Sequence, residues 1–258
     1  MKAEYILHLA DNALIHGQRI AEWCGHGPVL EEDIAMANIG LDSIGQARML
    51  YQYAATLIGG DTTEDSLAYF RSAPEFRNYT ILELPHQTAH APSTKVQRDY
   101  SITITRNFLY SALMSLVWPA LQNSKDEQVA AIAAKSSKEV RYHLRHSTDW
   151  MLRLGDGTPL SHDKMQAALD YLMPYTQELF TASAFEQEAV RNGVGISVAA
   201  LKNEWQSRVA TVVTQATLQM SPAAGHLTRG KEGMHSEHLS YLLAEMQSLA
   251  REHPGAVW

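Results

Sequence analysis

The sequence has very little cysteine and no long apolar run, and each shortage excludes a class of protein. Cys24 is the single cysteine in 258 residues, so no disulfide can form within the chain and no oxidising compartment is needed. The longest uncharged apolar run, FLYSALMSLVWPAL, is shorter than the roughly 20 residues of a membrane-spanning helix. The amino terminus lacks the apolar block of a signal peptide. We therefore expect a cytoplasmic protein with no membrane partner.

Concentrated positive charge is missing as well. The formal net charge is -7 and no run of Lys and Arg offsets it locally, so nucleic acid is not expected as a partner. The sequence contains no Gly-rich phosphate loop, nucleophile elbow or CxxC motif. Hydrophobic residues make up 45% and charged residues 19%, which is typical of a globular protein that can bury a sizeable core.

Helical periodicity recurs along the chain, and no strand pattern of comparable strength accompanies it. Four long helices joined by short or moderate connections, with further helices behind them, fit a helical bundle. We predict an all-α protein with one domain over residues 1–258. The periodicity, caps and breakers predict helices at about 3–23, 31–58, 65–71, 99–121, 126–154, 161–191, 197–219 and 236–252, the 161–191 helix being kinked or split at Pro174.

The polar stretch SKEVRYHLRHSTDW, residues 137–150, raises the question of a metal site. Its Glu139, His143 and His146 fall at i, i+4 and i+7 and so share one helix face. A carboxylate and two imidazoles with a water would be a zinc arrangement. A carboxylate-bridged di-iron bundle needs more, namely a Glu from each of two helices and Glu-x-x-His from each of the other two.

The chain does not supply that di-iron set. Glu139-Val-Arg-Tyr142 has tyrosine at the histidine position, and Asp42-Ser-Ile-Gly45 has glycine there. Residues 100–122 contain no Asp or Glu at all. Both half-motifs keep the acid and lose the imidazole, and one helix lacks its carboxylate. We therefore predict no catalytic residue, no metal ligand and no cofactor in this chain.

A structural polar core is the interpretation that we prefer for these residues. His143 is expected to be a buried hydrogen-bonding partner of Glu139 or Asp42, with His146 on the same face. A buried carboxylate needs a cation or other donors, and Arg106 on the 99–121 helix is expected to supply the cation.

A second cluster of histidines lies near the C-terminus, in GKEGMHSEHLSYLLAEMQ. His235, Glu237 and His238 surround the start of the last predicted helix, so capping is the interpretation that we favour, with an interface role as the alternative. The chain ends in the apolar segment PGAVW, and Trp258 is a candidate for contact with a partner or for intramolecular cover.

Three motifs carry a family resemblance: EWCGHGPVLEEDIAMANIGLDSIGQARML, KEVRYHLRHSTDWMLRLGDGT and GMHSEHLSYLLAEMQ, with the terminal PGAVW. Over nearly the whole chain they closely resemble the C subunits of multicomponent phenylacetyl-CoA epoxidases. The resemblance implies a ferritin-like four-helix bundle with additional C-terminal helices that has lost its iron ligands. It also implies a catalytic A subunit that holds the di-iron centre, together with other small subunits and a reductase.

The resemblance identifies Asp42, Gly45, Glu139 and Tyr142 as the family's degenerate half-sites, so no catalytic role transfers to them. Before the 99–121 helix the family has an Asn-Gly pattern followed by Phe-Ala, whereas this chain reads LPHQTAHAPSTKVQRDY and is longer. The departure leaves room for a divergent paralogue that serves another acyl-CoA or aromatic substrate.

The sequence thus predicts a non-catalytic structural subunit that packs against the catalytic subunit in phenylacetate catabolism. An extensive apolar interface would make the isolated chain self-associate, and a homodimer is possible. One alternative is a metal-binding ferritin-like oxidoreductase with Glu139, His143 and Asp42 or Asp11 as unconventional ligands. Another is a regulatory subunit that binds an acyl-CoA in the bundle cavity.

Overall fold

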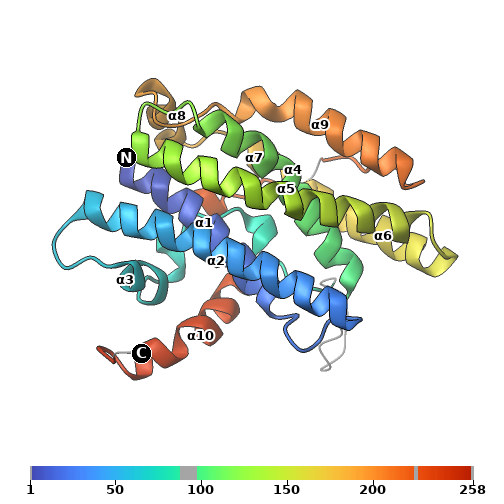
Figure 1. The fold of residues 1–258 in the computed structure, drawn as a ribbon, viewed down its shortest axis with the longest axis horizontal. Helices are drawn as coiled ribbons and strands as arrows, with labels where there is room; N and C mark the ends of the chain where they lie inside the picture. Colours follow the sequence, from blue (N-terminus) through green and yellow to red (C-terminus); the bar gives the residue numbers. More distant parts are fainter. Residues whose placement is uncertain (1, 88–97, 224–225, 257–258) are drawn as a thin grey trace. The chain divides into compact units, whose positions relative to one another are not determined.

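The computed structural model describes residues 2–87, 98–223 and 226–256, and the regular elements in these ranges are helices (Figure 1). Apart from one isolated bridge between Arg229 and Met234, the described ranges show no β-structure. The all-α prediction is confirmed for these residues. The elements are α1 (Lys2–Ala21), α2 (Leu30–Ile58), α3 (Glu64–Tyr69), η1 (Ala73–Glu75), η2 (Thr80–Leu82), α4 (Tyr100–Leu121), α5 (Glu127–Gly155), α6 (Pro159–Leu172), η3 (Met173–Thr176), α7 (Gln177–Phe180), α8 (Ala184–Arg191), α9 (Val198–Gln215), η4 (Gly230–Glu232) and α10 (Glu237–Glu252).

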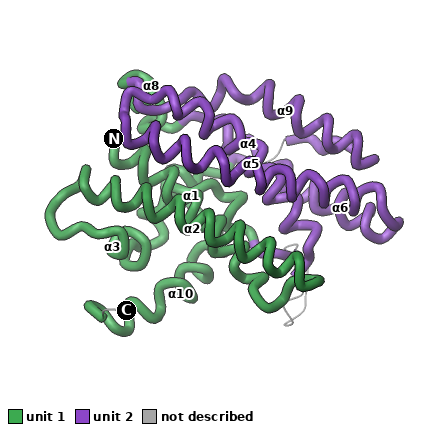
Figure 2. The backbone as a smooth tube through the Cα atoms, in the orientation of Figure 1, with its two compact units in different colours: residues 1–84, 183–192, 228–258 green, residues 85–182, 193–227 purple. Residues whose placement is uncertain are grey.

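The chain divides into two compact units, which Figure 2 draws in different colours. Unit 1 is made of residues 1–84, 183–192 and 228–258, and it carries α1, α2, α3, α8 and α10. Unit 2 is made of residues 85–182 and 193–227, and it carries α4, α5, α6, α7 and α9. The chain leaves unit 1 and returns to it twice. The single domain expected over residues 1–258 stays a prediction.

In unit 1, α1 and α2 lie side by side and run in opposite directions (Figure 1). Asp11 meets Tyr51, whereas Gly17, further along α1, meets Gly40, which lies earlier in α2. A Cβ atom on Gly17 would stand 3.2 Å from the Gly40 carbonyl oxygen. The absence of a side chain at Gly17 therefore lets the two backbones approach closely.

In unit 2, α4 and α5 form the corresponding antiparallel pair. The Thr105 hydroxyl lies 3.7 Å from the Met151 sulfur, and the Gln122 amide donates to the Ser137 hydroxyl at 2.8 Å. α9 packs on the same pair, where the indole of Trp205 donates to the Leu109 carbonyl at 3.1 Å. α4 is apolar on almost every side and accordingly is buried along nearly its whole length.

Side-chain caps fix the beginnings of the two long helices of unit 2. The Asp99 carboxylate accepts from the Ser101 N–H at 2.9 Å, and the Asp126 carboxylate accepts from the Val129 N–H at 3.1 Å. The helices predicted from the sequence begin at Asp99 and Asp126, whereas the structure makes these residues the N-caps just outside α4 and α5.

The helix predicted at 161–191 is divided, as the proline indicated. α6 ends at Leu172, a 3₁₀ turn contains Pro174, and α8 begins anew after the cap residue Ser183. α6 starts at Pro159 rather than Ser161 because Thr158 and Ser161 form a capping box.

The prediction of a helix up to residue 219 was too long, since α9 ends at Gln215. Thr217 has a φ of 61°, a left-handed value that a helix cannot contain and that a β-branched residue rarely adopts. Among the described residues no helix is long and apolar enough to cross a membrane. Of the longer segment before α4, residues 88–97 lie outside the described ranges.

Two helical glycines with opposite surroundings should respond oppositely to alanine. A Cβ on Gly155 would stand 2.5 Å from the Ala216 carbonyl oxygen and 2.8 Å from the Ala216 Cβ, whereas a Cβ on Gly45 would meet nothing within 4 Å. We expect Gly155→Ala to lower the free energy of unfolding by about 1–3 kcal/mol. Gly45→Ala should raise it by roughly 0.5–1 kcal/mol. Urea titration measures both, and equal stability of the two variants would refute the packing argument.

Candidate functional site

The half-motif positions lie on α2 and α5 in different degrees of burial. Asp42, Gly45 and Glu139 are half-buried. Gly45 has no side chain to offer, and a Cβ placed there would point into open space. The α2 half-motif therefore has no side chain at its histidine position, and the space there is open.

Tyr142 occupies the histidine position of the α5 half-motif, and the structure turns it to the surface. Its side chain is 39% exposed, while His143, the next residue, is 2% exposed. One residue is about 100° of rotation in a helix, which accounts for the difference. The Tyr142 ring lies 6.3 Å from the His143 ring and 6.1 Å from the ring of the half-buried His146, measured between centroids.

Arg106 is fully buried, and it donates to a histidine and to a backbone carbonyl. Its guanidinium donates to His86 Nδ1 at 3.0 Å and to the Pro85 carbonyl at 3.5 Å. Since arginine can only donate, His86 Nδ1 accepts and the His86 ring is neutral at that nitrogen. The Thr103 hydroxyl also lies 2.5 Å from this nitrogen. His86 is not among the residues that the sequence singled out.

His235, just before α10, contacts a buried carboxylate that the sequence did not connect with it. His235 Nδ1 lies 2.5 Å from Glu83 Oε1, and its Nε2 lies 3.0 Å from the Phe76 carbonyl oxygen. Both ring nitrogens therefore face oxygen atoms of unit 1. Ser236 holds the N-cap position, but its hydroxyl and N–H donate to Glu83 at 2.7 and 2.8 Å, with no bond into the first turn.

The other C-terminal candidates have smaller roles in the structure. Glu237 is exposed in the first turn of α10, where a negative charge suits the helix dipole. Burial and the nearby Arg19 cation lower the pKa of His238. Trp258 lies outside the described residues.

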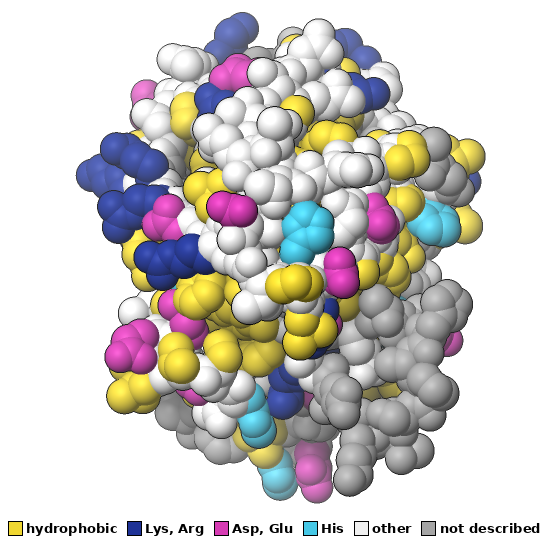
Figure 3. Space-filling view, turned by 90° about the vertical axis from the view of Figure 1, so that its right-hand side faces the viewer, with side chains coloured by type: hydrophobic (Ala, Val, Ile, Leu, Met, Phe, Trp, Pro, Cys, Tyr) yellow, Lys and Arg dark blue, Asp and Glu magenta, His cyan; other side chains and the backbone are white. Residues whose placement is uncertain are grey.

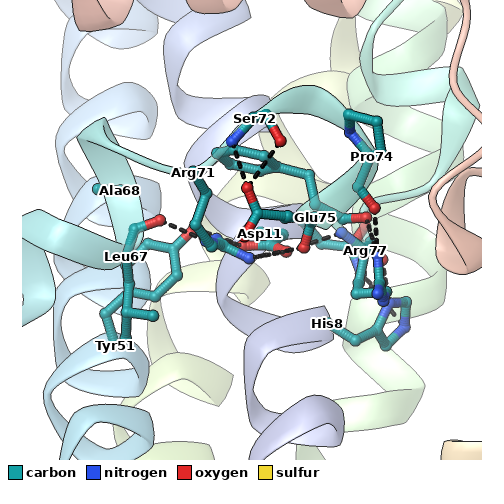
Figure 4. Close-up of polar contacts among 12 residues, drawn as sticks. His8, Asp11, Tyr51, Leu67, Ala68, Arg71, Ser72, Pro74, Glu75 and Arg77 are labelled. Carbon is teal, nitrogen blue, oxygen red and sulfur yellow. Dashed lines mark hydrogen bonds and ion pairs between the residues drawn. The ribbon is translucent and has the colours of Figure 1, made fainter. Parts of the chain in front are cut away.

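Asp11 on α1 is a second fully buried carboxylate of unit 1, and Figure 4 shows its surroundings. The guanidinium of Arg71 donates to both Asp11 oxygens. The Tyr51 hydroxyl donates to Oδ1 at 2.5 Å, and the backbone N–H of Arg77 donates to Oδ2 at 2.8 Å. The carboxylate is thus held by one cation and two further donors, which come from α2 and from the 71–77 segment.

The electrostatics of this cluster keep each group in its bonded form. Burial and the Asp11 charge raise the pKa of the Tyr51 hydroxyl well above its ordinary value, so Tyr51 remains a donor. Burial disfavours the Arg71 cation, but the charges of Asp11 and Tyr51 and the hydrogen bonds to Asp11 together outweigh burial and raise the pKa of Arg71. Arg71 therefore remains a cation beside Asp11.

A third buried carboxylate, Glu186 on α8, is balanced by lysine. Lys231 Nζ lies 2.7 Å from Glu186 Oε2, and the Ser183 N–H and hydroxyl donate to the same oxygen at 2.8 and 2.9 Å. His8 on α1 lies nearby, with its Nε2 3.8 Å from Glu186 Oε1. His8 Nδ1 lies 2.6 Å from the Arg77 carbonyl oxygen, so this nitrogen carries the proton.

These donor sets do not fit a di-iron centre. Within the residues that the structure describes, no three His, Cys, Asp or Glu side chains are grouped so that they could hold a metal ion. Two deeply buried acids of unit 1 each bind a protein cation: Asp11 binds Arg71, and Glu186 binds Lys231. A third, Glu83, lies against the His235 ring. Asp11 is one of the unconventional ligands that the sequence left open, and its lone pairs are taken by Arg71, Tyr51 and Arg77.

Comparison with known proteins identifies the family of this chain. The family described as "Phenylacetic acid catabolic protein" matches residues 1–258. A relative from Escherichia coli (strain K12), the C subunit of "1,2-phenylacetyl-CoA epoxidase", is 41% identical over 254 residues, which are 98% of this chain and 98% of the relative. The resemblance found in the three sequence motifs is confirmed.

Removal of the cation beside Asp11 should be costly. Arg71→Met leaves a carboxylate that is 0% exposed without its ion pair, and we expect the free energy of unfolding to fall by about 3–5 kcal/mol. The double variant Asp11→Asn, Arg71→Met should recover part of this loss. Arg191→Met, which removes an exposed ion pair with Glu188, is the matched control and should cost less than about 1 kcal/mol. Equal losses from the two single variants would contradict the buried-pair argument.

His8 should make stability depend on pH. Burial lowers the pKa of His8 in the folded protein, against the charge of Glu186 and with that of Lys231. The unfolded chain therefore takes up the proton first as the pH falls below about 6.5, and folding stability declines there. In His8→Gln this part of the decline should disappear.

The measurement is urea unfolding at several pH values between about 5 and 7.5. His26→Gln provides the control, since His26 is exposed in the same unit. If the wild-type chain and His8→Gln lose stability in parallel over this range, His8 does not titrate as described.

Proposed function

The chain belongs to the phenylacetic acid catabolic protein family, and we propose that it acts as the C-type subunit of a phenylacetyl-CoA epoxidase. In this role it is a non-catalytic structural subunit in phenylacetate catabolism. It packs against a catalytic subunit, and that partner holds the di-iron centre and carries out ring epoxidation. Other small subunits and a reductase complete the system, which we place in the cytoplasm.

The observation that carries the proposal is how the buried acids are balanced. Bundles that hold two irons present carboxylates and imidazoles to the metals. Here Asp11 and Glu186, both buried, are bound by Arg71 and Lys231, and the histidine positions of the half-motifs are Gly45 and an exposed Tyr142. Protein cations thus supply the positive charge in unit 1, which supports a structural role.

An exposed apolar face on α2 supports a packing role. Leu30, Ile34 and Leu41 are 72%, 53% and 66% exposed. At about 100° per residue they lie within roughly 40° of one another around the helix. Large aligned apolar side chains on a surface mark an interface, and the relative with 41% identity is a subunit by name. We assign this face to the catalytic partner.

The proposal is tested by co-expression with the neighbouring oxygenase genes. We expect the chain to co-purify with its catalytic partner, the metal of the complex to stay unchanged in Glu139→Ala, and epoxidation of phenylacetyl-CoA to be lost or strongly reduced when this chain is left out. A chain that purifies as a monomer without any partner would refute the proposal. Iron bound to the isolated chain and lost in Glu139→Ala would favour the oxidoreductase alternative.

A matched pair of variants tests the docking face. Leu41→Glu places a charge in the apolar α2 face and should abolish co-purification, because an unpaired charge in an apolar interface is costly. Leu160→Glu is the control, since Leu160 is 69% exposed on α6. Circular dichroism checks that both variants fold. Retention of the complex by Leu41→Glu would assign the interface to another face.

A further inference from the structure

Positive side chains are not spread evenly over the surface. Figure 3 shows a group of Lys and Arg side chains at the left edge of the face that it draws. On α5, exposed basic side chains form such a group at Lys135, Lys138, Arg141 and Arg145. The sequence contains no run of basic residues here, because Val140, Tyr142 and other neutral residues intervene.

Helical geometry collects these cations on one face. At about 100° per residue, Lys138, Arg141 and Arg145 lie within roughly 60° of one another, and Tyr142 lies within roughly 100° of all of them. Lys138 and Arg145 are seven residues apart, which is about 10 Å along the axis. The face lies opposite the buried stripe that contains Val140 and Ser147.

The basic side chains of this face are not neutralised within the described part of the chain. Lys138, Arg141 and Arg145 form no ion pair with another described residue, whereas the exposed Arg191 and Arg208 are paired with Glu188 and Glu204. The Arg145 guanidinium instead lies 6.0 Å from the centre of the Tyr142 ring. The face therefore presents concentrated positive charge on a protein whose net charge is -7.

The surface is hollowed at this point. This cleft is shallow and open: about 420 Å³ of space lies among the side chains of Lys138, Arg141, Tyr142 and Arg145, all on the exposed face of α5. Three strong donors to anions thus surround one aromatic ring that is 39% exposed. Arginine recognises phosphate oxygens in pairs, and an aromatic face accepts a nucleobase.

A second depression lies on the side of α5 that faces α9. This groove of about 330 Å³ has Phe108 and Ala112 of α4 at its floor, Leu144 and Thr148 of α5 on one side and Ser207, Arg208, Thr211 and Val212 of α9 on the other. Around α5, Thr148 is only about 20° from Arg141. The groove, which has apolar and polar side chains in its lining, therefore lies beside the cationic cleft around α5.

We propose that this face of unit 2 binds a coenzyme A thioester, with its phosphates and adenine in the cleft and its acyl arm in the groove. Coenzyme A combines an adenine, three phosphate groups and a long arm that ends in the thioester. In this arrangement the three cations bind the phosphates, Tyr142 stacks on the adenine, and the groove accommodates the acyl arm. The inference rests on the proposed function, because the relative's substrate names the coenzyme. The site differs from the bundle cavity that the sequence had suggested for an acyl-CoA.

The test is calorimetric titration of the full chain with four probes: phenylacetyl-CoA, coenzyme A, adenosine 3′,5′-bisphosphate and inorganic phosphate. We expect the first three to bind, phenylacetyl-CoA most tightly, and inorganic phosphate to bind at least about tenfold more weakly than the bisphosphate, since one phosphate engages part of the cation cluster. Equal binding of inorganic phosphate would reduce the site to an adventitious ion only and overturn the proposal.

Variants assign the binding to the cleft. Arg141→Glu and Arg145→Glu should each weaken coenzyme A by about tenfold or more. Lys202→Glu makes the same charge change at an exposed position of α9 and should have no effect. Tyr142→Ala should weaken coenzyme A by about threefold to tenfold and Tyr142→Phe hardly at all, because stacking needs only the ring. An unchanged titration in both arginine variants would refute the site.

The groove has its own variant. Thr148→Trp fills it, so the affinity for phenylacetyl-CoA should fall to that of adenosine 3′,5′-bisphosphate, whose own affinity should stay the same. If Thr148→Trp also loses affinity for adenosine 3′,5′-bisphosphate, the assignment of the acyl arm to the groove and of the phosphates to the cleft is wrong.

Failure of this inference and failure of the proposed function give different results. If coenzyme A does not bind but the chain assembles with its catalytic partner, the function stands and the inference falls. If coenzyme A binds and no complex forms, the proposed function falls. If Arg141→Glu and Arg145→Glu prevent assembly while no probe binds, the face is a docking surface for an acidic protein and the inference is overturned.

Discussion

The ion pair between Asp11 and Arg71 is the interaction on which the rest of unit 1 depends. A carboxylate that is buried away from solvent needs hydrogen-bond donors. Asp11 lies on the first helix, and all of its donors come from later in the sequence. Tyr51 comes from the second helix and Arg71 from the segment after the third. The pair therefore holds the 71–77 segment against α1 and fixes the position from which the chain continues.

The same rule orders the distant returns of the chain to unit 1. Residues 183–192 bring Glu186, and residues 228–258 bring the Lys231 that neutralises it. The latter segment also brings His235 to Glu83. Each return is thus tied by a buried charge pair, and such pairs specify partners more strictly than apolar contacts, because a wrong partner leaves an uncompensated charge. The acid-rich interior is balanced by side chains of the chain itself.

Sequence reasoning located the helices well because their signals are local. Apolar periodicity, caps such as Asp126 and breakers such as Pro174 act over a few residues, and α5 and α6 follow them closely. The charge clusters could not be predicted in this way. Asp11 and Arg71 are 60 residues apart, and Glu83 and His235 are 152 residues apart. No local pattern selects one arginine or histidine among many as the partner of a given acid.

Helix α5 shows how one residue of register separates two roles. His143 is buried and Tyr142, its neighbour, stands in the cationic cleft. A scan for charge along the sequence misses the cleft, since the basic residues are three and four positions apart and gather only after the helix winds.

A subunit without a metal-binding donor set can still contribute to the chemistry of its complex by holding substrate. A ligand retained on one protein of the complex is presented to its neighbour at an effective concentration that solution does not reach, provided that the ligand can span the distance between the two sites. The contribution would depend on ionic strength, because exposed cations are screened over a Debye length of about 8 Å at physiological salt. The apolar α2 face that we propose for docking is not screened in this way. The two surfaces can therefore be distinguished by experiment: binding at the cationic cleft weakens with salt, whereas binding at the α2 face depends on the burial of apolar area.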